Sequence, residues 1–314
     1  MTKTSSTRAA INASIGVPIA LVWVDPSAPR EVDRLTLAPM PQIAIWMALL
    51  STDFRLDLLQ RTGTQALLGE PVIVVDTREG WSEVRLPWQP SSLSPDGYPG
   101  WVRSAHLVPL PVNEGGELAI VRKSLREAVR ADDGSTLELS FGTILPAVME
   151  GLAIVALRHP NGTTLCVSPD AVDLLPNRRF MEPGEPSTET SRQLLETAWL
   201  FLDMPYLWAG LSGYGVDCSG FVHLIYRSAG IRVSRDAHDQ AIQGEPVELA
   251  NALPGDPVFF AGERGVHHVG LTTASGRMLH SPRTGQTVSD DLIASPNYEG
   301  EYVTSRSFIA TPSV

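Results

Sequence analysis

One cysteine at the start of a predicted helix could serve as a nucleophile. Cys218 opens a segment whose apolar residues recur at helical spacing, namely Phe221, Val222, Ile225 and Ala229. A thiol in the first turn of a helix lies at the positive end of the helix dipole, which favours the thiolate. The small residues that follow the cysteine leave space for a substrate to approach. A buried, inert thiol is the alternative, because free cysteines are usually packed in a core.

Two histidines downstream could complete this site. His268 lies 50 residues after Cys218, and His280 follows 12 residues later. Each falls on its own predicted strand, so neighbouring strands could bring the rings together as a general base and the group that orients it. Successive residues on a strand face opposite sides, so only one of His267 and His268 can point at Cys218. The same three side chains could instead bind zinc with an open position for water. The helix position favours a nucleophile, and we expect no metal.

The composition of the chain excludes several classes of protein. Among 314 residues, 24 Lys and Arg stand against 35 Asp and Glu, and no basic run offers a surface for nucleic acid. Two cysteines are too few for a disulfide framework, and we expect Cys166 to be a packed, neutral thiol in a strand. The apolar stretch Ile15–Val24 is shorter than the ~20 residues of a membrane span, and Asp25 follows it without a cleavage pattern. We therefore expect a cytoplasmic protein, with export as the alternative.

The candidate residues need a scaffold, and the apolar pattern predicts an α+β chain with several domains. A helical stripe runs over Pro41–Gln60 with a break near Ser51. From Gly63 the period changes to two, and closely spaced short strands indicate small β-barrels. The predicted divisions are an N-terminal arm with bracing helices at 1–62, a first barrel at 63–111, a second barrel at 112–176, a proline-rich linker at 177–190 and a C-terminal domain at 191–314.

Both predicted barrels consist of short strands separated by turn residues. The end of the second block resembles the end of the first, which is a weak internal similarity. The predicted strands of the first block are Gln65–Leu68, Pro71–Asp76, Trp81–Leu86 and Gly100–Val102. Those of the second are Leu118–Val121, Thr136–Leu139, Thr143–Val148, Leu152–Arg158 and Thr164–Val167. The C-terminal domain is predicted to contain helices at Ser191–Leu202 and Val216–Ala229, and strands at Pro257–Phe260, Val266–Thr273 and Met278–His280.

Four pieces of the C-terminal domain surround the candidates: Pro205–Gly210 (PYLWAG), Val216–Val222 (VDCSGFV), His268–Leu271 (HVGL) and Met278–His280 (MLH). Together they resemble the NlpC family of papain-like cell-wall cysteine peptidases. By this resemblance Cys218 is the nucleophile, His268 is the base because it directly precedes Val-Gly, and His280 is the third catalytic residue. Tyr206 resembles the tyrosine that helps the Cys218 amide to hold the oxyanion. Ala209 is a departure, since the family often has glycine there.

The resemblance extends upstream to the predicted barrels, which look like bacterial SH3-like domains. The pieces Thr64–Glu70 (TQALLGE) and Gly97–Val102 (GYPGWV) resemble the first such domain of the cytoplasmic, peptide-recycling branch of the family. In that branch this domain closes one end of the active site. The resemblance therefore implies that Glu70, Tyr98 and Asp236 meet the free amino-terminus of the substrate. Further substrate contacts that it implies are Trp208, Asp217, Ser219 and Arg235.

The resemblance implies a definite reaction and partner. The expected activity is hydrolysis of the bond between γ-D-glutamate and a diamino acid, meso-diaminopimelate or L-Lys, in murein peptides that carry a free N-terminal L-Ala. No cofactor is required, and neither nucleic acid nor a membrane is an expected partner. Two alternatives stay open: a non-catalytic protein that binds cell-wall peptides, and an exported wall-remodelling hydrolase, amidase or acyltransferase on the same fold.

Overall fold

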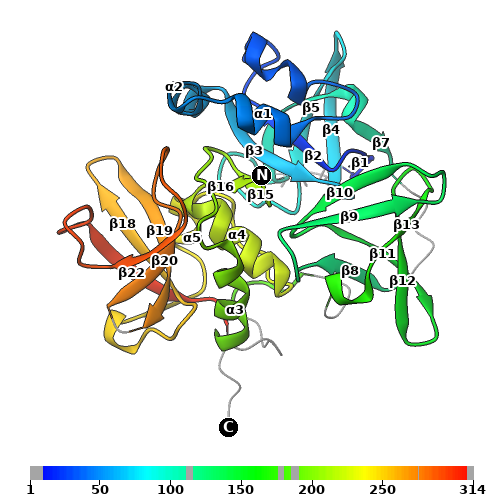
Figure 1. Cartoon of the computed structure of the whole chain (residues 1–314). Coiled ribbons are helices and arrows are strands. Elements are labelled where there is room, and N and C mark those ends of the chain that lie inside the picture. The colour runs from blue at the N-terminus through cyan, green and yellow to red at the C-terminus, as the bar shows by residue number, and fades with distance from the viewer. Residues whose placement is uncertain (1–9, 111–115, 176–179, 185–190, 275, 310–314) are drawn as a thin grey trace, which may run out of the picture.

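The computed structural model describes residues 10–110, 116–175, 180–184, 191–274 and 276–309. These residues form two seven-stranded sheets followed by a region of helices and a six-stranded sheet, which confirms the predicted α+β class. In Figure 1 the helices of the C-terminal region stand between its own sheet and the second barrel. Of the predicted linker, residues 177–179 and 185–190 lie outside the described residues.

The first sheet curls into the barrel that the short strands predicted. Its hydrogen-bonded order is β3-β2-β6-β5-β4-β1-β7. The arm before the helices supplies two of these strands, one of which, β2, falls within the apolar stretch Ile15–Val24. The strands are β1 (Ala13–Ile15), β2 (Ile19–Trp23), β3 (Thr62–Leu67), β4 (Pro71–Arg78), β5 (Trp81–Leu86), β6 (Tyr98–Arg103) and β7 (Leu107–Pro109).

Two short α-helices lie between β2 and β3, as the helical stripe predicted. Helix α1 covers Ile43–Leu49 and helix α2 covers Thr52–Leu56. The break falls at Ser51, whose hydroxyl accepts the backbone N–H of Phe54 at 3.3 Å and so caps α2. Trp46 of α1 is buried, and its indole N–H donates to the buried carboxylate of Asp33 at 3.0 Å.

The second sheet repeats the topology of the first. Its order is β10-β9-β13-β12-β11-β8-β14, which is the first order with every number raised by seven. The weak internal similarity in the sequence therefore reflects two copies of one architecture. A short 3₁₀ turn precedes the last strand in both. The strands are β8 (Leu118–Val121), β9 (Arg126–Ala131), β10 (Thr136–Ser140), β11 (Ile144–Glu150), β12 (Ala153–Arg158), β13 (Thr164–Cys166) and β14 (Val172–Leu174).

The C-terminal region packs helices against an antiparallel sheet of order β17-β22-β18-β19-β20-β21. Its helices are α3 (Ser191–Ala198), α4 (Cys218–Ser228) and α5 (Ala237–Gln240). Its strands are β15 (Leu211–Ser212), β16 (Gly215–Val216), β17 (Glu245–Val247), β18 (Pro257–Gly262), β19 (Gly265–Ala274), β20 (Arg277–His280), β21 (Ser289–Leu292) and β22 (Tyr302–Ser307).

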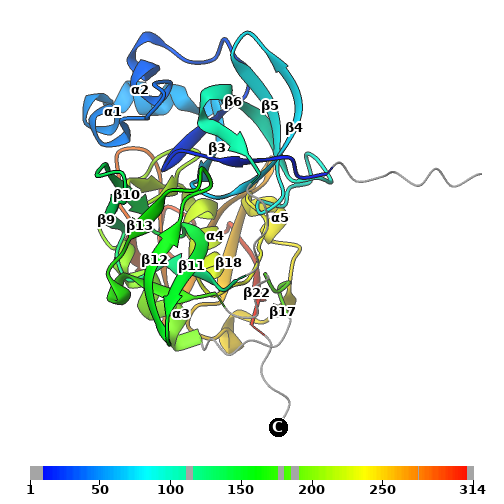
Figure 2. The same cartoon turned by 90° about the vertical axis from the view of Figure 1, so that its right-hand side faces the viewer.

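One hydrophobic core joins the first barrel to the C-terminal region. It contains Trp23 and Trp101 of the barrel, Trp46 of α1, Phe221 of α4 and Val269 of β19. Figure 2 shows the first barrel lying above both the second barrel and the C-terminal region. Because the core is continuous, the first barrel is fixed relative to α4 and β19.

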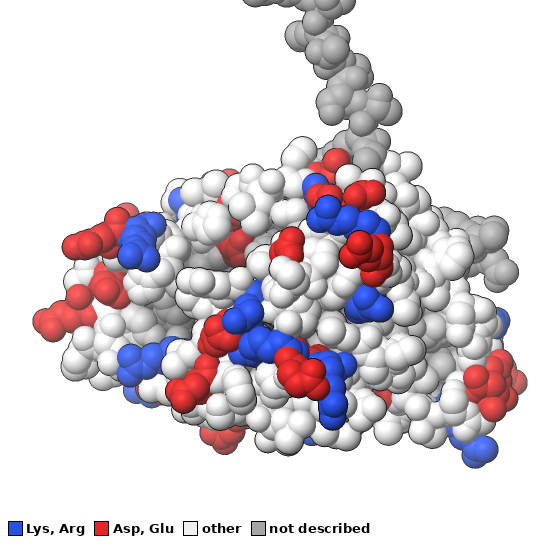
Figure 3. Space-filling model, turned by 90° about the horizontal axis from the view of Figure 1, so that it is seen from above, with Lys and Arg blue, Asp and Glu red and all other residues white. Residues whose placement is uncertain are grey.

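The surface of the described residues mixes charges of both signs. Seen from above in Figure 3, acidic and basic side chains are interspersed over this face. Some charged side chains take part in more than one ion pair. Arg30, for example, contacts both Asp33 at 2.8 Å and Asp57 at 2.9 Å. Within the described ranges no helix is both long enough and apolar enough to cross a membrane.

Candidate active site

Cys218 lies in the first turn of helix α4, as the apolar pattern predicted, although the helix begins at Cys218 and the predicted start, Val216, lies in β16. The helix begins there because the carboxylate of Asp217 caps it, accepting the backbone N–H of Gly220 at 2.7 Å. Cys218 is 9% exposed, and the backbone groups of Ser219 and of Val269 on β19 lie close enough to lower the pKa of its thiol. The nucleophile candidate therefore lies against the strand that carries His268.

The two histidines contact one another across neighbouring strands. His268 Nε2 lies 2.7 Å from His280 Nδ1, and His280 Nε2 lies 2.9 Å from the carboxylate of Asp291 on β21. His267 points to the other face of β19, where it is half exposed and contacts Glu301 at 3.2 Å. Strand alternation therefore separates the two histidines as expected, and His268 is the one that lies inside.

Sequence reasoning missed two members of this cluster. Asp291 orients His280, and the ring of Tyr298 stacks on His268 with centroids 4.8 Å apart and planes 7° apart. Strand β21 shows no clear period-two pattern in the sequence, and Tyr298 lies in a loop, so neither had a local signal. Only the pairing of β20 with β21, which sets His280 opposite Ser289, brings Asp291 within reach.

The resting thiol is neutral, contrary to the expectation from the helix dipole. Burial raises the pKa of Cys218 to about 12, and the adjacent charge of Asp217 adds to the rise. The backbone groups of Val269 and Ser219 and the guanidinium of Arg235 lower this pKa by less. Burial, and secondly the neighbouring His280, hold the pKa of His268 well below its usual range. The resting pair is therefore a thiol and a neutral imidazole.

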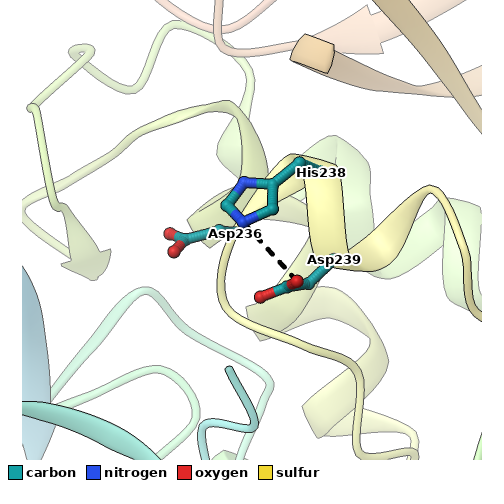
Figure 4. A group of neighbouring side chains, drawn as sticks. All are labelled: Asp236, His238 and Asp239. Carbon is teal, nitrogen blue, oxygen red and sulfur yellow. Dashed lines mark ion pairs between the residues drawn. The ribbon is translucent and has the colours of Figure 1, made fainter. Parts of the chain in front are cut away.

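The ring geometry favours a base and its orienting group over zinc ligands. The facing nitrogens of His268 and His280 are hydrogen-bonded to each other, whereas two zinc ligands would direct these lone pairs at a common ion. A cluster of potential metal ligands does exist elsewhere among the described residues, at Asp236, His238 and Asp239 (Figure 4). Asp239 contacts His238 at 3.5 Å and accepts the backbone N–H of Ser92 at 2.8 Å, so this cluster contacts a loop of the first barrel.

Tyr206 and its neighbours lie beside the nucleophile. Burial, and secondly the Cys218 sulfur, raise the pKa of Tyr206, so its hydroxyl stays protonated and able to donate. Trp208 is tied to the first barrel, since its indole N–H donates to the carbonyl of Thr62 at 3.1 Å. Ala209 has a φ of 60°, in the left-handed region that favours glycine. This conformation explains why glycine suits that position.

Three of the predicted substrate contacts are bonded to one another around the nucleophile. Arg235 Nη2 donates to Asp217 Oδ2 at 2.7 Å, and Nη1 donates to Ser219 Oγ at 3.0 Å. All three side chains are buried. The guanidinium thus holds the residues that immediately precede and follow Cys218.

Tyr98 and Asp236 interact electrostatically, whereas the carboxylate of Glu70 is bonded to other residues. Burial, and secondly the charge of Asp236, raise the pKa of Tyr98. Glu70 is fully buried, and its carboxylate accepts hydrogen bonds from Arg227 Nη1 at 3.0 Å and Gln89 Nε2 at 2.8 Å. The carboxylate of Glu70 thus joins the barrel to α4, and its expected role at the substrate's amino-terminus stays a prediction. A correction concerns Cys166, which is exposed and not packed.

Comparisons with known proteins agree with this arrangement. The NlpC/P60 family pattern matches residues 203–307, and the pattern of the bacterial dipeptidyl-peptidase SH3 domain matches residues 60–107. A gamma-D-glutamyl-L-lysine dipeptidyl-peptidase of Bacillus subtilis is 34% identical over 288 residues, which cover 90% of this chain and 94% of that protein. A Bacillus cereus protein of the same name is 31% identical, with coverages of 95% and 91%.

A solved structure extends the similarity to the arrangement of the domains. The crystal structure of an NlpC/P60 family protein from Bacillus cereus matches with a TM-score of 0.86 at 30% identity, covering 95% of this chain and 99% of that one. The match includes the barrels as well as the region of Cys218. The chain therefore belongs to the NlpC/P60 family of cysteine peptidases.

Proposed function

We propose that this enzyme hydrolyses the amide between γ-D-glutamate and a diamino acid in cell-wall peptides with a free N-terminal L-Ala. The observation that carries the proposal is Cys218 at the start of α4, held against the strand on which His268 binds His280. The two Bacillus relatives, named for the γ-D-glutamyl-L-lysine bond, support this substrate class. Either L-Lys or meso-diaminopimelate is the diamino acid.

The proposed reaction proceeds through a thioester. The Cys218 sulfur attacks the γ-carbonyl carbon, and His268 takes the thiol proton as the S–C bond forms. The C–N bond then breaks while His268 returns that proton to the leaving amine. Water, deprotonated by His268, hydrolyses the thioester and regenerates the thiol. The first N–H groups of a helix have no acceptor within it, so the Cys218 amide and the Tyr206 hydroxyl are the donors for the oxyanion.

The proposal extends to the end of the substrate that the first barrel meets. Tyr98 of the barrel and Asp236 beside α5 are the groups proposed to receive the free alanine ammonium. A carboxylate in a half-buried position favours a cation over an amide, because an acylated amine brings no compensating charge. Such a site would reject stems attached to intact wall. We therefore propose a role in recycling released peptides, in the cytoplasm.

The test is mass spectrometry of purified enzyme incubated with L-Ala-γ-D-Glu-L-Lys and with the meso-diaminopimelate peptide. We expect L-Ala-γ-D-Glu and the free diamino acid as products. Cys218→Ala should fold and bind peptide but lose turnover, whereas Cys166→Ser serves as the matched control and should retain it. Residual turnover in Cys218→Ala, or inactivation of the wild type by a chelator, would contradict the thioester route.

The same assay separates the alternatives. Efficient digestion of intact sacculi would favour an exported wall-remodelling hydrolase. Transfer of the acyl group to an added amine in preference to water would favour an acyltransferase. Tight peptide binding without turnover in the wild type would favour a binding protein.

A further inference from the structure

We propose that the first barrel positions the nucleophile through a buried chain of hydrogen bonds, in which Thr64 and Gln89 are positioning residues. This inference rests on the proposed function for its activity measurement. The chain starts at the N-terminal end of α4, crosses the barrel and returns to the C-terminal end of the same helix. Its members in order are Asp217, Arg235, Thr64, Gln89, Glu70 and Arg227.

The first half of the chain holds both neighbours of Cys218. Arg235 binds Asp217 on one side of the cysteine and Ser219 on the other, at 2.7 and 3.0 Å. The guanidinium side chain is 1% exposed, so its remaining N–H groups need acceptors inside the protein. Its Nε–H donates to Thr64 Oγ1 of strand β3 at 2.8 Å. The peptidase region thus depends on a barrel hydroxyl to complete the bonding of Arg235.

The second half runs through the barrel to the far end of α4. Thr64 Oγ1 donates to Gln89 Oε1 at 2.7 Å, and Gln89 Nε2 donates to Glu70 Oε1 at 2.8 Å. Arg227 of α4 donates to the other Glu70 oxygen at 3.0 Å. From Arg235 to Glu70 every donor points the same way, so each bond polarises the next. Both ends of the nucleophile helix are therefore tied to one buried network of the barrel.

This network governs the charge beside the nucleophile. The carboxylate of Asp217 raises the pKa of Cys218, and the guanidinium of Arg235 lowers it. Without the Thr64 hydroxyl, Arg235 loses one of the bonds that keep it on Asp217, and the thiol becomes harder to ionise. The other ionisable groups around the thiol are Tyr206, Tyr298, His268 and His280. These belong to other elements and stay in place when Thr64 changes.

The decisive comparison uses two substitutions of one residue in a Cys166→Ser background. Thr64→Val keeps the side-chain shape and removes the hydroxyl, whereas Thr64→Ser keeps the hydroxyl. We expect Thr64→Val to lower kcat on L-Ala-γ-D-Glu-L-Lys roughly tenfold with KM within about twofold, because a buried charged donor is left unpaired. Iodoacetamide labelling of Cys218 should slow by a similar factor, and its pH profile should move to higher pH. Thr64→Ser restores both.

Two further variants keep the test decisive. Gln89→Met acts through Thr64 and should shift kcat and labelling in the same direction. Thr143→Val, at a buried hydroxyl without a hydrogen-bond partner among the described residues, should leave both unchanged.

Wild-type kinetics and labelling in Thr64→Val would overturn the proposal. Loss of folding in both Thr64→Val and Gln89→Met would also overturn it, since the chain would then hold the fold and not the nucleophile. If wild type leaves the peptide intact, the proposed function fails, and labelling alone decides this inference.

Discussion

His268 Nε2 and His280 Nδ1 lie 2.7 Å apart, and this contact determines which nitrogen of His268 receives the thiol proton. His280 Nε2 faces the carboxylate of Asp291 and therefore carries a proton. A neutral His280 then has a bare Nδ1, which accepts the Nε2–H of His268. His268 Nδ1 is left as the basic nitrogen for Cys218.

Asp291→Asn should disrupt this arrangement, in which Nε2 of both His280 and His268 carries the proton. The amide N–H₂ can donate to His280 Nε2, which would move the proton to Nδ1 and reverse the bond to His268. We expect kcat to fall about a hundredfold with little change in KM, less than for a buried triad carboxylate because Asp291 is half exposed. Asp290→Asn is the matched control, since Asp290 pairs with Arg277, and its kcat should change little. Equal kcat values for the two variants would contradict the proton order.

The order of alkylation of the two cysteines tests the neutral resting thiol. Cys166 is exposed, whereas Cys218 is 9% exposed with its pKa raised to about 12, so iodoacetamide should label Cys166 first. The thiolate fraction grows tenfold per pH unit below the pKa. The labelling rate of Cys218 should therefore keep rising beyond about pH 9. A plateau below about pH 8.5 would instead indicate a thiolate–imidazolium pair.

Glu70→Leu should destabilise the protein, because it leaves Arg227 charged and unpaired between the barrel and α4. Both side chains are almost completely buried. Breaking such a pair costs about 3–5 kcal/mol in the free energy of unfolding, which urea denaturation measures. Glu83→Leu breaks the more exposed Glu83–Arg85 pair in the same barrel and should cost under about 1 kcal/mol. Adding Arg227→Met to Glu70→Leu should recover much of the loss, and similar losses for Glu70→Leu and Glu83→Leu would refute this reading.

Asp236 should set the preference for a free amino-terminus. We expect wild type to favour L-Ala-γ-D-Glu-L-Lys over its N-acetyl form at least roughly tenfold in kcat/KM, and Asp236→Asn to lose most of that preference. Burial raises the pKa of Asp236, so the carboxylate is protonated as the pH falls, and the preference should shrink on the acidic side. His238→Gln, in the same cluster, is the control that should retain it. A wild-type preference below about tenfold would exclude this role.

The amino-acid sequence by itself determined the local features. Apolar residues at helical spacing placed Cys218 at a helix start, and period-two segments located most strands of both barrels. Side chains on one element reach the core in a fixed periodic order, so a short window of sequence contains that information. The motif around Cys218 and the Val-Gly pair after His268 indicated the candidate catalytic residues. Strand alternation supports the choice of His268, because His267 lies on the opposite face of β19.

The tertiary structure decided the contacts that join distant segments. Glu70 and Arg227 are 157 residues apart, and nothing local in either segment indicates the pair. Asp291 reached His280 only through strand pairing. The protonation state of the Cys218 thiol depended on two opposing effects. The helix start favours the thiolate modestly, whereas burial opposes it more strongly. Burial is a property of everything packed around a group, so no pattern along the chain could have supplied it.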